Sequence, residues 1–381
     1  MLSAWETFVP GTEKKKLREK IAEELLPEKM EEQQLMDAGN PVLPWDMIVE
    51  ILSWLPPKSL CRFTSVSKPW KSLVYNPNFV KFHFKKSSEN KDAFFRRRRV
   101  MFTMPDGNSI YSLNLGNLLL SYDENYSDIG DLVAPEIDLV RTEFPCGRIE
   151  DLLYCEGFLL CELGKPEQLY LVNPATGEAK KLPEGPKYLD HKGVYSLKTD
   201  SWRVVKSPIQ YNDADTTHGV LLNGSVHWVM TKVGKESSPV IVSFHLAEEE
   251  FREIPLPLKG SGFIPNEYYV LGVFRYCLCL TRCDDFKIHD EFWVMKHYGI
   301  RQSWTNIKTS FRYSELYHTS FWKDSHDLLL LDCQFVMYDF NKKSFRNLSV
   351  REFLEFENAG IYMESLVSSN YYGGLDPEHE I

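Results

Sequence analysis

The chain has 381 residues, enough for two domains with hydrophobic cores of their own, and its 43% hydrophobic and 13% aromatic residues are typical of a globular protein. The formal net charge of −10 gives no electrostatic reason to expect nucleic acid as a partner. No stretch approaches the ~18 apolar residues that a membrane span needs, so no membrane partner is expected either.

Residues 1–40 are dense in Glu and Lys and contain no apolar run of the kind found in secretory signals. Leu17, Ile21 and Leu25 share a helical face that Pro27 interrupts, which predicts a charged extension, partly helical or disordered. The eight cysteines are scattered without a CxxC pair, which favours reduced thiols over a disulfide framework. We therefore expect the cytoplasm, the nucleus or both as the location.

Residues 41–86 carry the clearest helical pattern. In "WDMIVEILSWL" the polar residues Asp46, Glu50 and Ser53 form one narrow stripe and leave the rest of the circumference apolar. Two prolines downstream, in "LPPKSL" and "SKPWKS", stand where a new helix can begin without an N–H group. About forty residues cannot enclose all of these apolar side chains, so part of the surface should belong to another chain.

Residues 87–100 are predicted to be a basic linker. The four arginines at 96–99 could be a nuclear localisation signal, but we favour a solvated charge run beside the domain boundary.

From residue 101 to 368, short β-rich runs recur, each followed by a polar turn and a returning strand. Later units begin at 194, 241, 292 and 335, hence 47, 51 and 43 residues apart, which is close to the ~40–50 residue period of propeller blades. A radial array of small antiparallel sheets leaves only short edges exposed. The predicted fold class is α+β and multidomain: a small helical unit, an all-β propeller-like domain, and a flexible tail over 369–381. A β-sandwich is the alternative.

The helical segment resembles an F-box through "LPWDMIVEILSWLP", "KSLCRFTSVSKPWKSLV" and "NPNFVKFHF", which occur in order at the expected spacing. The β region resembles the F-box associated domain of plant F-box proteins, including S-locus F-box and F-box/kelch types, through pieces such as "LVNPATGEAKKLP", "VYSLKTDSWRVV" and "FWVMKHYGIRQSWTNI". One departure is the short segment at 184–193, where family members carry a further strand or two. One blade is therefore expected to be incomplete there, or the gene model is truncated.

The resemblance implies that the F-box binds a Skp1-like adaptor and, through it, a cullin-RING ligase, while the β domain binds a protein substrate. The residues implied to contact the adaptor are Leu43, Pro44, Ile48, Ile51, Leu52, Leu55, Pro56, Leu60, Val66 and Trp70. Leu43 and Pro44 are expected to fix the entry of the chain, and Trp70 to be the aromatic anchor.

The β region shows no nucleophile motif, no phosphate-binding loop and no zinc-like spacing, so we expect no catalytic residue, no cofactor and no metal. Cys277 and Cys279 share a strand face with Cys283 nearby, which favours core thiols. His227 is expected to be a packed histidine. The tryptophans in successive hairpins, Trp202, Trp228, Trp293 and Trp304, are expected to pack between blades.

The sequence therefore predicts a non-catalytic substrate receptor of an SCF (Skp1–cullin–F-box) E3 ubiquitin ligase, which acts by holding a substrate near the ubiquitin-loaded enzyme. Two alternatives stay open. The shortened stretch motivates a paralogue that binds the adaptor but recruits no substrate. A propeller can also host an enzyme, because fold does not determine function. The substrate and its binding residues are not identified by the sequence.

Overall fold

The computed structural model describes residues 45–89, 97–104, 107, 109–114, 132–133, 137–140, 148–155, 157–164, 168–185, 192–205, 211–213, 219–233, 238–258, 268–283, 287–323, 325–349 and 356–369. The predicted N-terminal extension and residues 370–381 of the predicted tail lie outside them.

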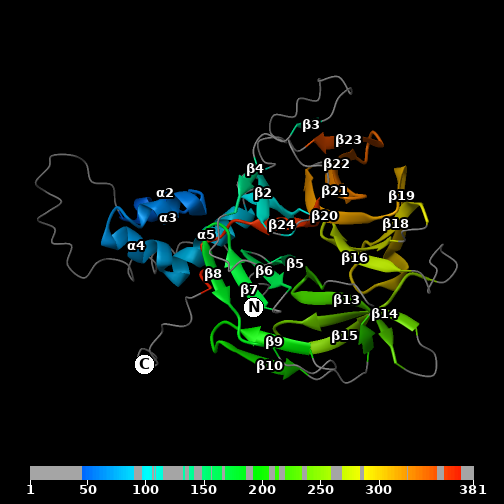
Figure 1. Cartoon of the computed structure of the whole chain (residues 1–381), viewed down its shortest axis with the longest axis horizontal. Coiled ribbons are helices and arrows are strands. Elements are labelled where there is room, and N and C mark those ends of the chain that lie inside the picture. Colours follow the sequence, from blue (N-terminus) through cyan, green and yellow to red (C-terminus); the bar gives the residue numbers. More distant parts are fainter. Residues whose placement is uncertain are drawn as a thin grey trace, which may run out of the picture.

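Four short helices form a unit at one side of the molecule (Figure 1). They are α2 (Trp45–Leu52), α3 (Pro57–Phe63), α4 (Lys68–Tyr75) and α5 (Pro77–Glu89). Local chemistry sets where they begin. Pro57 occupies the first turn of α3, and the Ser67 hydroxyl accepts from the Trp70 amide at the start of α4. The helices pack around a shared core that includes Leu60, Leu73 and Phe79.

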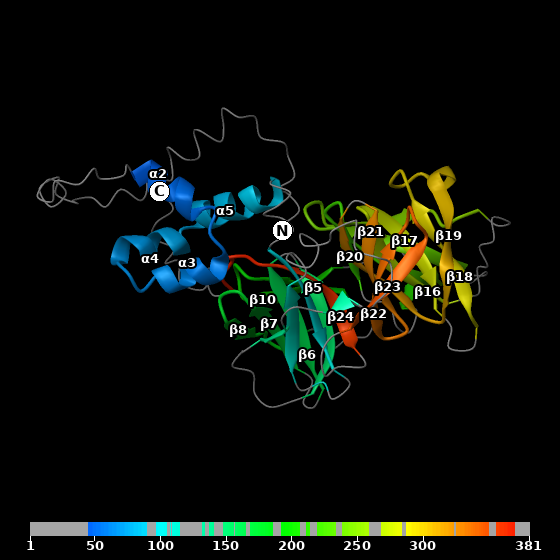
Figure 2. The ribbon, with the colours of Figure 1, turned by 90° about the horizontal axis from the view of Figure 1, so that it is seen from above.

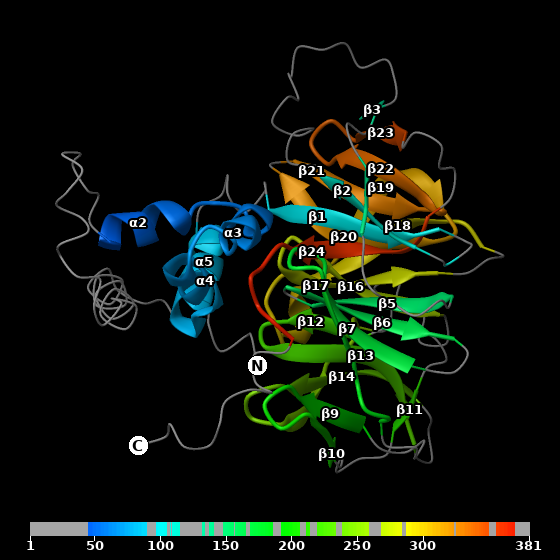
Figure 3. The ribbon, with the colours of Figure 1, turned by 60° about the vertical axis from the view of Figure 1, so that its left-hand side comes forward.

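The strands of the described residues form five sheets of four or five strands, which stand side by side as the blades of a propeller (Figures 1 and 3). The all-β propeller after a small helical unit is therefore confirmed, and the sandwich alternative is wrong. Blade 1 consists of β1 (Arg98–Thr103), β2 (Ile110–Asn114), β4 (Ile137–Leu139) and β24 (Glu357–Met363). Blade 2 consists of β5 (Ile149–Cys155), β6 (Phe158–Leu163), β7 (Gln168–Asn173) and β8 (Glu178–Lys181).

The remaining three blades follow in chain order. Blade 3 consists of β11 (Tyr211–Asp213), β12 (Val220–Leu222), β13 (Ser225–Lys232), β14 (Ser238–His245) and β15 (Glu250–Ile254). Blade 4 consists of β16 (Tyr269–Phe274), β17 (Cys277–Arg282), β18 (His289–Met295) and β19 (Trp304–Tyr313), with the short helix η2 (Arg301–Ser303) before β19. Blade 5 consists of β20 (Leu316–Lys323), β21 (His326–Leu331), β22 (Gln334–Asp339) and β23 (Ser344–Ser349), with β3 (Leu132–Val133) parallel to β23.

A sixth, smaller sheet lies between blades 2 and 3 in the chain order. Its two strands, β9 (Lys192–Ser196) and β10 (Ser201–Val205), pair only with each other within the described residues. This hairpin begins at Lys192, within the last residues of the stretch at 184–193 where the sequence analysis expects an incomplete blade.

The first and last strands of the propeller close the ring. β24 pairs antiparallel with β1, with Val100 opposite Ile361. Gly360 of β24 lies against the ring of Tyr154, and the Tyr154 hydroxyl donates to the carbonyl oxygens of Met101 and Asn358. Blade 1 is thus built from both ends of the domain, which ties residues 97–114 to residues 356–363.

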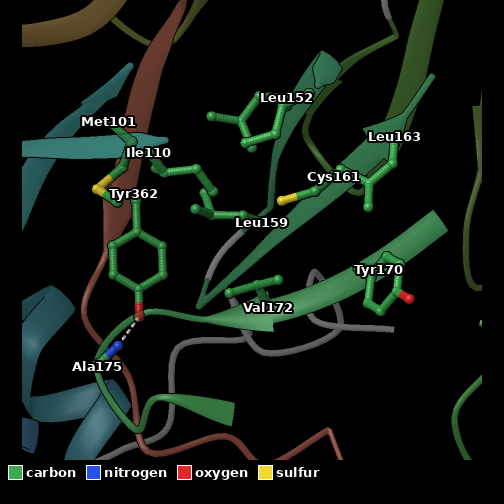
Figure 4. Packing of buried hydrophobic residues seen from close by; sticks show 11 residues of the cluster. Met101, Ile110, Leu152, Leu159, Cys161, Leu163, Tyr170, Val172, Ala175 and Tyr362 are labelled. Carbon is green, nitrogen blue, oxygen red and sulfur yellow. Dashed lines mark hydrogen bonds between the residues drawn. The ribbon is translucent and has the colours of Figure 1, made fainter. Parts of the chain in front are cut away.

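The hydrophobic core lies largely between neighbouring blades. One cluster joins blades 1 and 2 around Leu159, Val172 and Tyr362 (Figure 4). Another joins blades 3 and 4 around Trp293, which is 1% exposed. Two further tryptophans form hydrogen bonds at such boundaries: the Trp202 indole donates to the Pro183 carbonyl at 2.8 Å, and the Trp304 indole donates to the Pro255 carbonyl at 2.7 Å.

The interpretation of the arginines at 96–99 as a solvated run is wrong for Arg97 and Arg98, which are only 4% and 8% exposed. Arg97 precedes β1 and donates to the carbonyl oxygens of Ser53 and Leu55 at 3.3 and 3.1 Å. Arg99 pairs with Glu364 at 2.5 Å. The charges of Arg97 and Arg99 are accommodated because the turn after α2 and the segment after β24 supply their acceptors.

Candidate functional site

The helical unit exposes a stripe of large apolar side chains along α2. Met47, Ile51 and Trp54 are each about half exposed, at 47%, 50% and 45%. Their spacing of four and three residues places them on one helical face, since the turn after α2 continues through Trp54. Val49 and Leu52 occupy the buried side. A row of exposed apolar residues of this kind is typical of a protein-contact surface.

A charged contact from α5 supports the end of this stripe. The Lys86 ammonium pairs with Glu50, donates to the Ser53 hydroxyl at 2.9 Å, and lies 4.4 Å from the centre of the Trp54 ring. The Trp54 indole in turn donates to Glu50 at 3.3 Å. These contacts restrict the rotamers of Trp54 before any partner arrives, which lowers the entropic cost of using it as a contact.

The turn between α3 and α4 offers a second exposed apolar side chain, Val66, which is 65% exposed. Trp70 lies one helical turn further on and packs edge-to-face on Phe63, with ring centres 5.3 Å apart. Trp70 is half-buried, so one part of the indole supports the helical core while another part reaches solvent.

Eight of the ten residues expected to contact an adaptor are described by the structure, and they divide into three groups. Ile51, Pro56 and Val66 are exposed, and Ile48, Leu55 and Trp70 are half-buried. Leu52 and Leu60 are 2% and 0% exposed and belong to the core of the helical unit. Leu43 and Pro44 lie outside the described residues.

Met47 and Trp54 do not belong to the expected set, yet the structure exposes both beside Ile51. The sequence contains the pattern that places them beside Ile51, because Met47 lies four residues before Ile51 and Trp54 three residues after it, which is the spacing of one helical face.

His227 and Cys279, which the sequence analysis expected to be packed residues, lie inside the propeller. His227 contacts the Val220 carbonyl oxygen at 3.1 Å and the Tyr298 hydroxyl at 2.6 Å. Burial raises the pKa of the Cys279 thiol well above its ordinary value, as expected for a core cysteine. No group of three or more His, Cys, Asp or Glu that could hold a metal occurs among the residues the structure describes. Within the same residues, no helix has the length and apolarity of a membrane span.

Comparisons with known proteins match these two parts of the chain. The family described as "F-box domain" matches residues 41–82, and the family described as "F-box associated beta propeller domain" matches residues 189–339. The F-box protein CPR1 of Arabidopsis thaliana is 24% identical over 388 aligned positions, covering 85% of this chain and 88% of that protein. An F-box/LRR-repeat/kelch-repeat protein of the same plant is 25% identical, covering 64% of this chain and 69% of its own length.

Among solved structures, a chain of "Crystal structure of Nidogen/Laminin Complex" covers 70% of this chain and 99% of its own length, at a TM-score of 0.43 and 10% identity.

Proposed function

The chain is a plant F-box protein with an F-box associated β-propeller domain, and from this premise we propose that it is the substrate-receptor subunit of an SCF E3 ubiquitin ligase. Its F-box binds a Skp1-like adaptor, which connects it to a cullin-RING ligase. Its propeller binds a protein substrate whose identity is open. The receptor has no chemical step of its own and acts by holding substrate lysines near the ubiquitin-loaded enzyme.

The observation that supports this proposal is the exposed stripe of Met47, Ile51 and Trp54, together with Val66. Met47 and Ile51 lie on α2 and Trp54 and Val66 in the turns after α2 and α3, and the opposite side of α2 is buried through Val49 and Leu52, so a folded scaffold presents these side chains. Large apolar and aromatic side chains of this kind carry most of the binding energy of protein interfaces. The proposed location of the complex is the cytoplasm, the nucleus or both.

The test is a titration of the full chain with a purified Skp1-like adaptor, in which binding is measured by calorimetry. We expect Val66→Asp and Ile51→Asp each to weaken binding by roughly 30-fold or more, because a charge replaces an apolar contact. Val204→Asp is the matched control, because Val204 is a 42% exposed valine on the propeller hairpin β9–β10. Absence of binding by the unmodified, folded chain would refute the proposal.

The two-stranded sheet β9–β10 favours a second candidate function. In this alternative the chain binds the adaptor but recruits no substrate, and so competes with other receptors. A reconstituted ligase distinguishes the two. A receptor directs ubiquitin to other proteins of a plant extract in a manner that Val66→Asp abolishes, whereas a competitor leads only to ubiquitin on itself.

A further inference from the structure

After β24 the chain leaves the propeller and runs along the border of the helical unit (Figures 2 and 3). Residues 364–369 have no regular secondary structure there, yet most of them are fully buried. Ser365 and Ser369 are 0% and 1% exposed, and Leu366 is 4% exposed. Irregular chain is normally found at the surface, so a buried segment of this kind needs partners for its backbone.

Leu366 belongs to the core of the helical unit. It packs in one cluster with Leu60, Leu73 and Phe79, which come from α3, α4 and α5. The core of the F-box therefore includes a residue from the far end of the propeller domain.

The backbone of the segment is held by blade 2. Asn173, at the end of β7, donates its side-chain amide to the carbonyl oxygens of Ser365 and Val367 at 3.1 and 2.7 Å. The Ser369 amide donates to Glu178 at 3.0 Å. Gly157 leaves room for the Ser365 side chain, since a Cβ at Gly157 would collide with it. Blade 2 is thus shaped around this segment.

A comparison with blade 5 separates the two roles of Asn173. Its side-chain oxygen accepts from the Ala175 amide at 2.9 Å and so shapes the turn after β7. Asp339 shapes the corresponding turn after β22, accepting from the Asn341 amide at 2.8 Å. An aspartate is therefore sufficient for the turn. The amide group that distinguishes Asn173 from Asp339 is the part that donates to residues 365 and 367.

The blade 1 end of the segment is fixed as well. The Glu364 amide donates to the Arg97 carbonyl oxygen at 3.0 Å, and the Glu364 carboxylate pairs with Arg99. The segment is therefore fixed to blade 1 at residue 364 and to blade 2 at residues 365, 367 and 369, with Leu366 between these contacts inserted into the helical core.

We propose that residues 364–369 are a strap that completes the F-box core and holds the F-box in one orientation on the propeller, with Asn173 as the residue that fixes the strap. Leu366 and Asn173 are positioning residues: they act on the helices without belonging to the exposed stripe. The expected effect on adaptor affinity rests on the proposed function, whereas the effect on the helices does not.

The test is hydrogen exchange of the full chain, read separately for α3–α5 and for the strands of blades 3 and 4. Asn173→Asp keeps the turn-forming oxygen and removes both donations to the strap. We expect it to accelerate exchange in α3–α5 by roughly tenfold, and Leu366→Ala to do so by tenfold or more, while blades 3 and 4 are unaffected. Asp339→Asn in blade 5 is the matched control and should leave the helices unchanged.

Unchanged exchange in α3–α5 of Asn173→Asp would overturn the proposal, even if Leu366→Ala accelerates it, because the strap would then not be fixed through blade 2. Acceleration across the whole chain would also overturn it, since that result indicates a general role in stability. The exchange experiment contains no adaptor. Failure of the unmodified chain to bind the adaptor would therefore refute the proposed function without contradicting the proposed role of the strap.

Discussion

The Arg97 guanidinium donates to the Leu55 carbonyl oxygen at 3.1 Å, although 42 positions separate the two residues in the chain. The same guanidinium lies 3.4 Å from His83 Nδ1, and the other ring nitrogen of His83 contacts the Leu55 carbonyl oxygen at 2.8 Å. Arg97, His83 and the end of the α2 turn therefore form one buried polar group between the F-box and the propeller.

This arrangement predicts that the F-box loses stability in acid. Burial, with the charge of Arg97 as the second cause, lowers the pKa of His83 to about 3. The ordinary pKa of histidine is near 6.5. Between about pH 6.5 and pH 3, His83 is therefore protonated in the unfolded chain but neutral in the folded chain, so the folded state loses stability as the pH falls. The stability lost relative to neutral pH should reach about 2 kcal/mol at about pH 5. The measurement is urea unfolding followed by helix circular dichroism.

The control for this prediction is His83→Gln, whose amide can still donate to the Leu55 carbonyl oxygen but does not titrate. The variant should show a flatter dependence of helix stability on pH. If its pH dependence matches that of the unmodified chain, another group is responsible for the acid sensitivity.

The ion pair of Arg275 and Asp327 predicts the opposite dependence on pH. Arg275 donates to Asp327 at 2.5 and 3.0 Å, yet burial raises the pKa of Asp327 to about 6 against the influence of the arginine. The folded state therefore prefers protonated Asp327, and this residue destabilises the fold increasingly as the pH rises from about 4 to 6.

Arg275→Met leaves this carboxylate without its partner. At about pH 8 the free energy of unfolding should fall by about 2 kcal/mol. This loss is smaller than that for fully buried ion pairs, because Arg275 is partly exposed. At about pH 5 the loss should be much smaller, because Asp327 is protonated there. Denaturation curves at both pH values measure this difference, and Arg275→Lys keeps the charge as a control. Equal losses at the two pH values would contradict the assignment to Asp327.

Two tryptophans predict a difference between blade boundaries. Trp304→Phe removes the indole donor to Pro255 from a partly buried site and should cost about 1 kcal/mol. Trp202→Phe removes the corresponding donor to Pro183 from an exposed site, where water replaces the lost bond, and should cost less. Midpoints of chemical unfolding measure both. The reverse order would show that packing at these sites outweighs the hydrogen bonds.

The closing strand of the propeller leaves no room for a side chain at residue 360. Gly360→Ala should destabilise the chain by about 1–3 kcal/mol, because its methyl group would collide with the Tyr154 ring. Tyr154→Leu removes that ring, so Gly360→Ala should cost less when it is combined with Tyr154→Leu. A double-mutant cycle measures this coupling, and strictly additive losses would refute it.

The sequence predicted most of the architecture because the signals are local. The prolines that begin helices, the apolar helical run and the repeat of hairpins along the chain depend on near neighbours, and the helical unit and the propeller agree with them. The hairpin repeat also predicted that Trp293 packs between blades, and the structure places it in the core between blades 3 and 4.

The orientation of individual side chains was harder to predict. A helix that is apolar on most sides does not reveal which side its own domain covers, so the sequence could not distinguish the buried Leu52 and Leu60 from the exposed Met47 and Trp54. Arg97 was misinterpreted because its acceptors come from distant helices. The sequence around Leu366 does not indicate that this residue belongs to the helical core, since the residues it packs against lie some 300 positions earlier in the chain.

The position of Leu366 has a consequence for the biosynthesis of the chain. Ribosomes add about 5–20 residues per second, so roughly 15–60 s pass between synthesis of α5 and synthesis of the residue that fills the core beside it. The helices emerge first but acquire their last core residue only when translation is nearly complete. A polypeptide that stops within the propeller would therefore lack a finished F-box core, so a folded F-box would signal that the propeller has been translated to its closing strand.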